Sequence, residues 1–175
     1  MVRRSVTWGL LLAWAANDAE EWFTMAPWSR KNAGGSAPGP VWLRREISTA
    51  HARTAIALMG AFMLAATVDG VRTGGRSRLY QATLAGFGVH GLGHLALSVS
   101  QRGYTPGVAT APTIVVPFSL WAWRALGRAG VRRDTARTLR DAAILLPVTL
   151  KAVHTGAHLL TSTREKAAED GQGSH

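Results

Sequence analysis

The residues of this chain that are best suited to chemistry form an acidic cluster and two histidine pairs. The acidic cluster, residues 17–21, reads Asn-Asp-Ala-Glu-Glu and contains three of the ten acidic residues of the chain. It lies in a segment that is otherwise largely apolar from Val6 to Trp28. A carboxylate near the centre of a membrane costs at least about 2.5 kcal/mol. The cluster therefore requires compensation by a metal ion, by histidines or by basic side chains on other helices.

Both histidine pairs have the spacing of one helical turn. His90 and His94 are four residues apart, and so are His154 and His158. Two imidazoles one turn apart on a helix can bind one metal ion, as in zinc-binding helices of the His-x-x-x-His type. The glutamate that follows the first histidine in His-Glu-x-x-His proteases is absent, because Gly91 has that place. A catalytic base has to come from another helix.

The acidic cluster can supply both a further ligand and that base. Asn17, Glu20 and Glu21 are spaced i, i+3, i+4 and share one face of a helix. We expect Zn²⁺, or another divalent transition metal, to be held by the histidine pair of residues 90 and 94, one histidine of the pair 154 and 158, and one of the two glutamates. The other glutamate then deprotonates the metal-bound water. Asn17 is the expected hydrogen-bond donor to the oxyanion.

Five apolar segments, each of about 20 residues, match the thickness of a bilayer. The predicted spans are residues 5–28, 52–71, 79–99, 108–126 and 141–160. They predict an all-α fold, a polytopic membrane bundle of about five transmembrane helices in one domain, residues 1–160. Residues 161–175 are predicted to be a polar, disordered tail. The first span has an alternative interpretation as a secretory signal peptide, because two arginines precede it and Ala13-Trp14-Ala15 resembles a cleavage site.

Helix direction predicts which polar groups meet. The first, third and fifth spans run in the same direction, and the acidic cluster and both histidine pairs lie in the later half of their spans. His51 begins the antiparallel second span and lies near the same side. We therefore expect Glu20 and Glu21 to face the third and fifth spans.

Composition limits the partners of this chain. The net charge is +10, and Arg and Lys cluster between the apolar segments, as is typical of charges that flank membrane spans. We expect a multi-pass protein of the cell membrane in contact with the lipid bilayer, its N-terminus inside. A nucleic-acid partner is not expected, because the basic residues are not interleaved with aromatics on one face. The absence of cysteine excludes thiolate metal sites and disulfides.

Other uses of these side chains remain open. In a purely structural role the carboxylates pair with Lys151 or Arg53, and the histidines are hydrogen-bonded packing residues. A haem protein would use histidines from two helices but needs no glutamates. Di-iron carboxylate sites favour Glu-x-x-His pairs on facing helices, and the sequence contains none.

The acidic cluster and a later turn together resemble a known family. Residues 17–22 read Asn-Asp-Ala-Glu-Glu-Trp, and His94 stands ten residues before the Tyr-Thr-Pro-Gly segment of residues 104–107. Both motifs are similar to those of the HXXEE-motif family of small bacterial integral membrane proteins, over about residues 10–120. The resemblance implies a metal-dependent membrane enzyme, and some members are associated with the maturation of modified peptides.

The chain departs from the motif that gives this family its name. Asn17 has the place of the motif histidine, so metal binding by that histidine is not carried over to Asn17. The family resemblance also places an asparagine four residues before the later histidine, where this chain has His90. The two residue types have exchanged positions.

Taken together, these patterns predict a membrane-embedded, metal-dependent hydrolase. The expected enzyme is an intramembrane metalloprotease that acts on a membrane-associated peptide, such as the leader of a modified-peptide precursor. The alternative is a non-hydrolytic transport or cation-binding protein, in which the carboxylates and imidazoles pass protons or bind a cation in transit.

Overall fold

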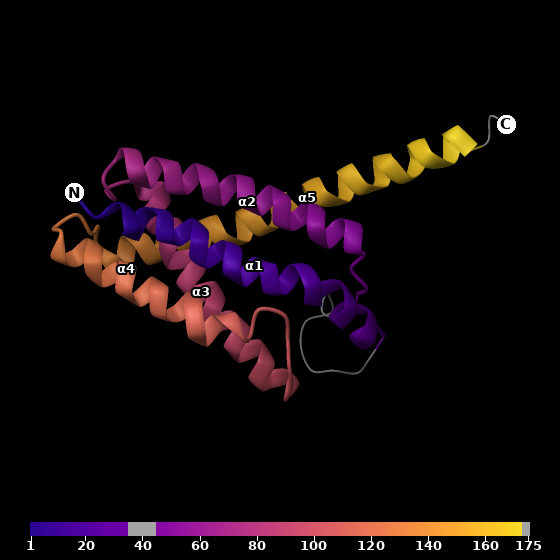
Figure 1. The fold of residues 1–175 in the computed structure, drawn as a ribbon, viewed down its shortest axis with the longest axis horizontal. Coiled ribbons are helices and arrows are strands. Elements are labelled where there is room, and N and C mark those ends of the chain that lie inside the picture. Colours follow the sequence, from indigo (N-terminus) through magenta and orange to yellow (C-terminus); the bar gives the residue numbers. More distant parts are fainter. Residues whose placement is uncertain (35–44, 173–175) are drawn as a thin grey trace.

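The computed structural model describes residues 1–34 and 45–172, with side chains to residue 163. This part of the chain forms a bundle of five α-helices and contains no strand (Figure 1). The helices are α1 (Arg4–Asn32), α2 (Thr49–Arg72), α3 (Arg78–Gln101), α4 (Val116–Arg128) and α5 (Thr135–Gln172), and a π-helical turn, η2 (Ala111–Val115), leads into α4. The predicted all-α fold is confirmed.

Helices α2, α3 and α5 are long and apolar enough to span a membrane. The remaining two differ: α1 carries the acidic cluster, and α4 has only 13 residues. Large apolar side chains are nevertheless exposed on several helices, among them Phe23 (72% exposed), Val99 (77%) and Ile144 (61%). Exposed apolar surface of this extent marks an interaction surface and is consistent with contact with the lipid bilayer. Three candidate membrane-spanning helices and this exposed apolar surface indicate a membrane protein.

Side-chain caps fix where three helices begin. Ser48 accepts a hydrogen bond from the backbone N–H of His51 at the start of α2, and Ser77 accepts one from that of Tyr80 at the start of α3. Asp134 does the same for Arg137 before α5. Such caps satisfy N–H groups that have no partner inside the helix. They extend the helices a few residues beyond the predicted apolar spans.

Helix α5 continues through most of the segment predicted to be a disordered tail. It runs as helix to Gln172, and its last turns project away from the bundle (Figure 1). Residues 165–169 read Glu-Lys-Ala-Ala-Glu, and all three residue types have high helix propensity.

The main core ties the N-terminal end of the bundle together. Leu10, Tyr80, Leu84 and Leu126 are fully buried there. The Tyr80 hydroxyl donates to the carbonyl of Val6 at 2.8 Å, which satisfies the one polar atom of that ring. This end also carries the turn between α2 and α3 and the connection between α4 and α5 (Figure 1).

The glycine-dense tract of α3 allows the next helical segment to approach closely. A Cβ at Gly91 would lie 2.7 Å from Cγ1 of Val115, and one at Gly88 would lie 3.1 Å from Cβ of Ser119. Small residues permit such contacts between membrane helices. The approach brings the segment before η2 beside the histidines of α3.

Candidate metal centre

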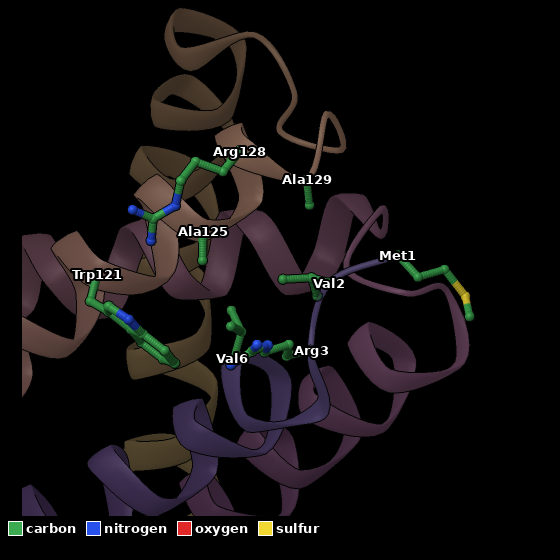
Figure 2. Close-up of a pocket in the computed structure, with 8 residues that line it drawn as sticks. All are labelled: Met1, Val2, Arg3, Val6, Trp121, Ala125, Arg128 and Ala129. Carbon is green, nitrogen blue, oxygen red and sulfur yellow. The ribbon is translucent and has the colours of Figure 1, made fainter.

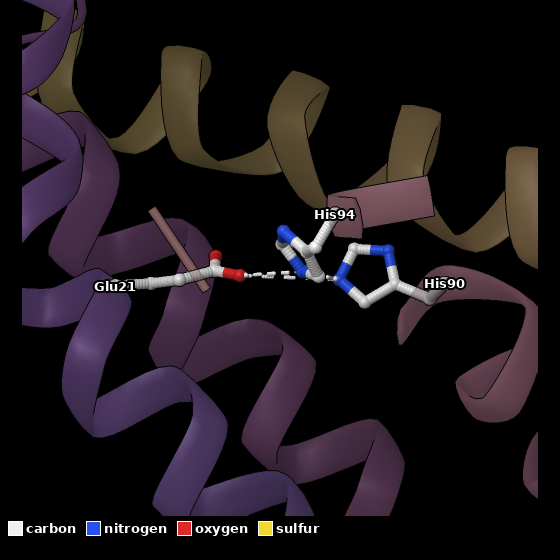
Figure 3. A group of neighbouring side chains, drawn as sticks. All are labelled: Glu21, His90 and His94. Atoms are coloured by element: carbon white, nitrogen blue, oxygen red, sulfur yellow. Dashed lines mark hydrogen bonds and ion pairs between the residues drawn. The ribbon is translucent and has the colours of Figure 1, made fainter. Parts of the chain in front are cut away.

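One carboxylate and two imidazoles converge between α1 and α3. Nε2 of His94 lies 3.1 Å from Oε1 of Glu21, Nε2 of His90 lies 3.9 Å from the same oxygen, and the two nitrogens are 2.8 Å apart (Figure 3). All three ligand atoms lie within 4.8 Å of one another. The spacing that predicted a shared helical face for His90 and His94 therefore does bring both rings to Glu21.

These donors fit a transition-metal ion. Imidazole nitrogens and a carboxylate oxygen are common zinc ligands, with bonds of about 2.0–2.2 Å, which place tetrahedral ligand atoms roughly 3.3 Å apart. The distances from Nε2 of His94 to its two neighbours, 2.8 Å and 3.1 Å, are close to that spacing. Three protein ligands with one open position are the arrangement of catalytic zinc sites.

The group is buried on one side and open on the other. Glu21 and His94 are buried, whereas the side chain of His90 is 33% exposed. The group is therefore not enclosed by protein on the side of His90. The described residues provide three ligands at this point, whereas structural zinc sites are typically closed by four protein ligands.

Asn17 holds the carboxylate of Glu21 in place. Its amide Nδ2 donates to Oε1 of Glu21 at 3.1 Å, and its Oδ1 lies 3.0 Å from the hydroxyl of Thr110. Within the described part of the chain, Oε2 of Glu21 has no hydrogen bond and stays free to accept a proton. The predicted role of Asn17 was donation to an oxyanion, but in the structure its amide is directed at Glu21.

Glu20, the neighbouring carboxylate, binds the turn that follows α3. Its Oε1 accepts from the Tyr104 hydroxyl (2.7 Å) and the backbone N–H of Ala109 (3.2 Å). Its Oε2 accepts from the backbone N–H of Thr110 (2.9 Å) and contacts the hydroxyl of that residue (2.7 Å). The structure therefore directs Glu20 at residues 104–110 and not at the histidines. No contact in the described residues supports the expected use of Glu20 as a metal ligand or a catalytic base.

Tyr104 is suited to remain a hydrogen-bond donor to Glu20. Burial and the nearby carboxylate raise the pKa of the Tyr104 phenol above its usual value, so the hydroxyl keeps its proton at neutral pH. Its backbone carbonyl accepts from the indole N–H of Trp28 at 2.9 Å. Two contacts with α1 thus hold this end of the turn.

Gly107 lets the same turn lie directly on the His94 ring. Its φ is +83°, and a Cβ at this position would lie 2.5 Å from Cε1 of His94. A side chain would be strained by that φ and would overlap the imidazole. The Tyr-Thr-Pro-Gly segment therefore orients His94 of the candidate centre. Sequence reasoning used it only as a family motif and assigned no role to Tyr104, Gly107 or Thr110.

The histidines of α5 do not join this group. Nδ1 of His154 lies 3.0 Å from Nε2 of His51 on α2, and the two rings share a hydrogen bond. His154 and His158 are both exposed. The expected site of His90, His94, one glutamate and one histidine of the pair 154 and 158 is not formed within the described residues, where His154 contacts His51 of α2.

Comparison with known proteins identifies the sequence motifs around this centre. Residues 8–122 match a family described as proteins of unknown function with an HXXEE motif. The chain belongs to the HXXEE family. No curated protein and no solved structure matches the chain.

In the structure, the two positions that differ from the HXXEE family pattern, Asn17 and His90, lie close together. Asn17 has the place of the motif histidine, and His90 precedes the later histidine by one turn. In the structure both contact Oε1 of Glu21, at 3.1 Å and 3.9 Å. The exchange therefore occurs around a single carboxylate. The matched segment contains all three residues of the candidate centre, but it ends before α5 and its histidines.

Proposed function

We propose that this HXXEE-family chain is a membrane-embedded, metal-dependent hydrolase that cleaves membrane-associated peptides. The observation that carries the proposal is the convergence of Glu21, His90 and His94 on one point with one side open. Open three-ligand sites of this composition are typical of hydrolytic zinc enzymes.

Each residue of the centre has a separate task in this proposal. Glu21, His90 and His94 hold the metal, Zn²⁺ or another divalent transition metal. A bound ion of this kind lowers the pKa of water and polarises a carbonyl group. Oε2 of Glu21 accepts the proton of the attacking water, while Asn17 fixes the carboxylate through Oε1. Glu20 and Gly107 hold the turn that orients His94.

The surroundings of the centre favour an apolar or membrane-associated substrate. The helix that carries His90 and His94 also exposes apolar side chains on its other faces, Val89 (47% exposed) and Leu92 (54%). A peptide that lies in or on the bilayer can contact this apolar surface while its own apolar side chains stay in contact with lipid. Leader removal from a modified-peptide precursor is a reaction of this class.

The second candidate is a non-hydrolytic protein that carries protons or a cation. The observation in its favour is the hydrogen bond between His51 and His154, since paired imidazoles can pass a proton between helices. In that case the Glu21 group binds an ion in transit and activates no water.

A cleavage assay separates the two functions. Zinc-loaded protein in detergent micelles is incubated with a panel of amphipathic peptides, and products are identified by mass spectrometry. We expect metal-dependent cleavage that falls at least about 100-fold in Glu21→Gln, the loss typical of removing a positioned base. Glu46→Gln, an exposed carboxylate outside the centre, serves as the matched control.

Two outcomes of this assay overturn the proposal. Cleavage that persists unchanged in Glu21→Gln or in a chelator assigns the activity to another site or to a contaminant. Absence of cleavage across the panel by protein with stoichiometric metal supports the transport function.

A further inference from the structure

A pocket separate from the metal centre opens at the N-terminal end of the bundle. It has a volume of about 330 Å³ and lies between the start of α1 and the last turns of α4 (Figure 2). Val6 lines the pocket, and Glu21 lies about four helical turns further along α1. The two sites are therefore at different depths.

Two arginines without ion-pair partners border this pocket. Arg3 and Arg128 both line it; Arg3 stands immediately before α1, and the side chain of Arg128 projects from α4 (Figure 2). Neither guanidinium has a carboxylate or hydrogen-bond partner within the described part of the chain. Guanidinium groups bind phosphate oxygens through two parallel hydrogen bonds. The pair is suited to an anionic ligand.

The rest of the lining is apolar. Val6, Ala125 and Trp121 contribute to the pocket wall. Trp121 and its neighbour Leu120 are 42% and 49% exposed, so apolar surface continues from the pocket along α4. A ligand that fits both features has an anionic head and an apolar tail. Tryptophan is also enriched where membrane proteins meet the headgroup region.

Charge at this end of the bundle agrees with such a ligand. Arg72 ends α2, and Arg76 and Arg132 lie on the neighbouring connections; all three add to the positive potential. By the distribution of Lys and Arg this end is expected to face the cytoplasm. The cytoplasmic leaflet is rich in anionic lipids, and basic pockets between helices bind their headgroups.

We propose that this pocket binds an anionic phospholipid. Its phosphate lies between Arg3 and Arg128, and an acyl chain follows Trp121 and Leu120 toward the bilayer. The lipid would join the N-terminal end of α1 to α4, and α1 also carries Glu21. The proposal does not depend on the hydrolase function, because no residue of the metal centre contributes to it.

Native mass spectrometry of the detergent-purified protein tests this site. The protein is titrated with phosphatidylglycerol and, separately, with phosphatidylcholine of the same chain length. We expect one retained phosphatidylglycerol at ratios where phosphatidylcholine is lost. Arg3→Gln and Arg128→Gln should each weaken retention about tenfold, and Arg128→Lys should weaken it less, because lysine keeps the charge but not the paired donors.

A matched control variant separates binding in the pocket from general attraction to the basic surface. Arg76→Gln removes an exposed charge at the same end that does not line the pocket, and it should leave retention within twofold. A thermal unfolding midpoint unchanged from the parent shows that each variant is folded. Equal loss in Arg76→Gln, equal retention of the two lipids, or displacement of phosphatidylglycerol by millimolar inorganic phosphate overturns the proposal; the last identifies a soluble-anion site.

Discussion

Replacing His94 with alanine should abolish metal binding, with a loss of affinity of at least about 100-fold. Replacing residues that only hydrogen-bond to metal ligands already lowers metal affinity 10–100-fold. Nε2 of His94 lies 2.8 Å from Nε2 of His90 and 3.1 Å from Oε1 of Glu21, so His94 is in closest contact with the other two members of the centre. It is also buried, so water cannot easily take its place. Metal affinity is measured by competition with a chromophoric chelator.

His158→Ala is the matched control for this prediction. His158 is also an intrahelical histidine of an i, i+4 pair, but it is exposed and outside the centre. Its substitution should leave affinity within about twofold. Equal loss of affinity in both variants contradicts the assignment, because it would mean that α5 supplies ligands.

Replacing Glu20 with alanine should destabilise the fold without removing the metal. The carboxylate of Glu20 accepts hydrogen bonds from two backbone N–H groups and the Tyr104 hydroxyl. The contacts with Tyr104 and Ala109 are exposed and the one with Thr110 is partly buried, and a typical intramolecular hydrogen bond contributes roughly 0.5–1.5 kcal/mol. We expect a lower thermal unfolding midpoint in detergent and, in protein that remains folded, retention of the metal.

Tyr104→Phe separates the parts of this network. It removes one donor and leaves both backbone contacts of Glu20, so its effect should be the smaller of the two. Glu21→Ala should show the opposite behaviour, with metal lost and a smaller change in the unfolding midpoint. A Glu20→Ala variant as stable as the parent contradicts the role of Glu20 as the anchor of residues 104–110.

The sequence was sufficient to predict the helices and the convergence of Glu21 with His90 and His94. Apolar length predicted the helices, and helix direction placed these three residues at one depth. Sequence spacing did not distinguish Glu20 from Glu21, because both project from the same side of α1. Their difference arises from the turn at residues 104–110, whose packing against α1 depends on tertiary contacts.

The histidines of α5 show a second limit of sequence reasoning. Depth along a helix follows from sequence position, but rotation about its axis follows from packing. The rotation of α5 directs His154 to His51 on α2, and this contact has no signature in residue spacing. The extension of α5 to Gln172 reflects helix propensity in a polar segment, which an apolar-span criterion does not detect.

Metal content per chain tests the central claim most directly. The protein is purified in detergent, loaded with Zn²⁺, freed of excess metal and analysed by inductively coupled plasma mass spectrometry, together with Glu21→Gln and its neighbour variant Glu20→Gln. We predict about one tightly bound ion in the parent and in Glu20→Gln, and none in Glu21→Gln, since an amide is a poor zinc ligand. A parent protein without metal, or a Glu21→Gln variant that keeps it, would contradict a metal centre at Glu21, His90 and His94.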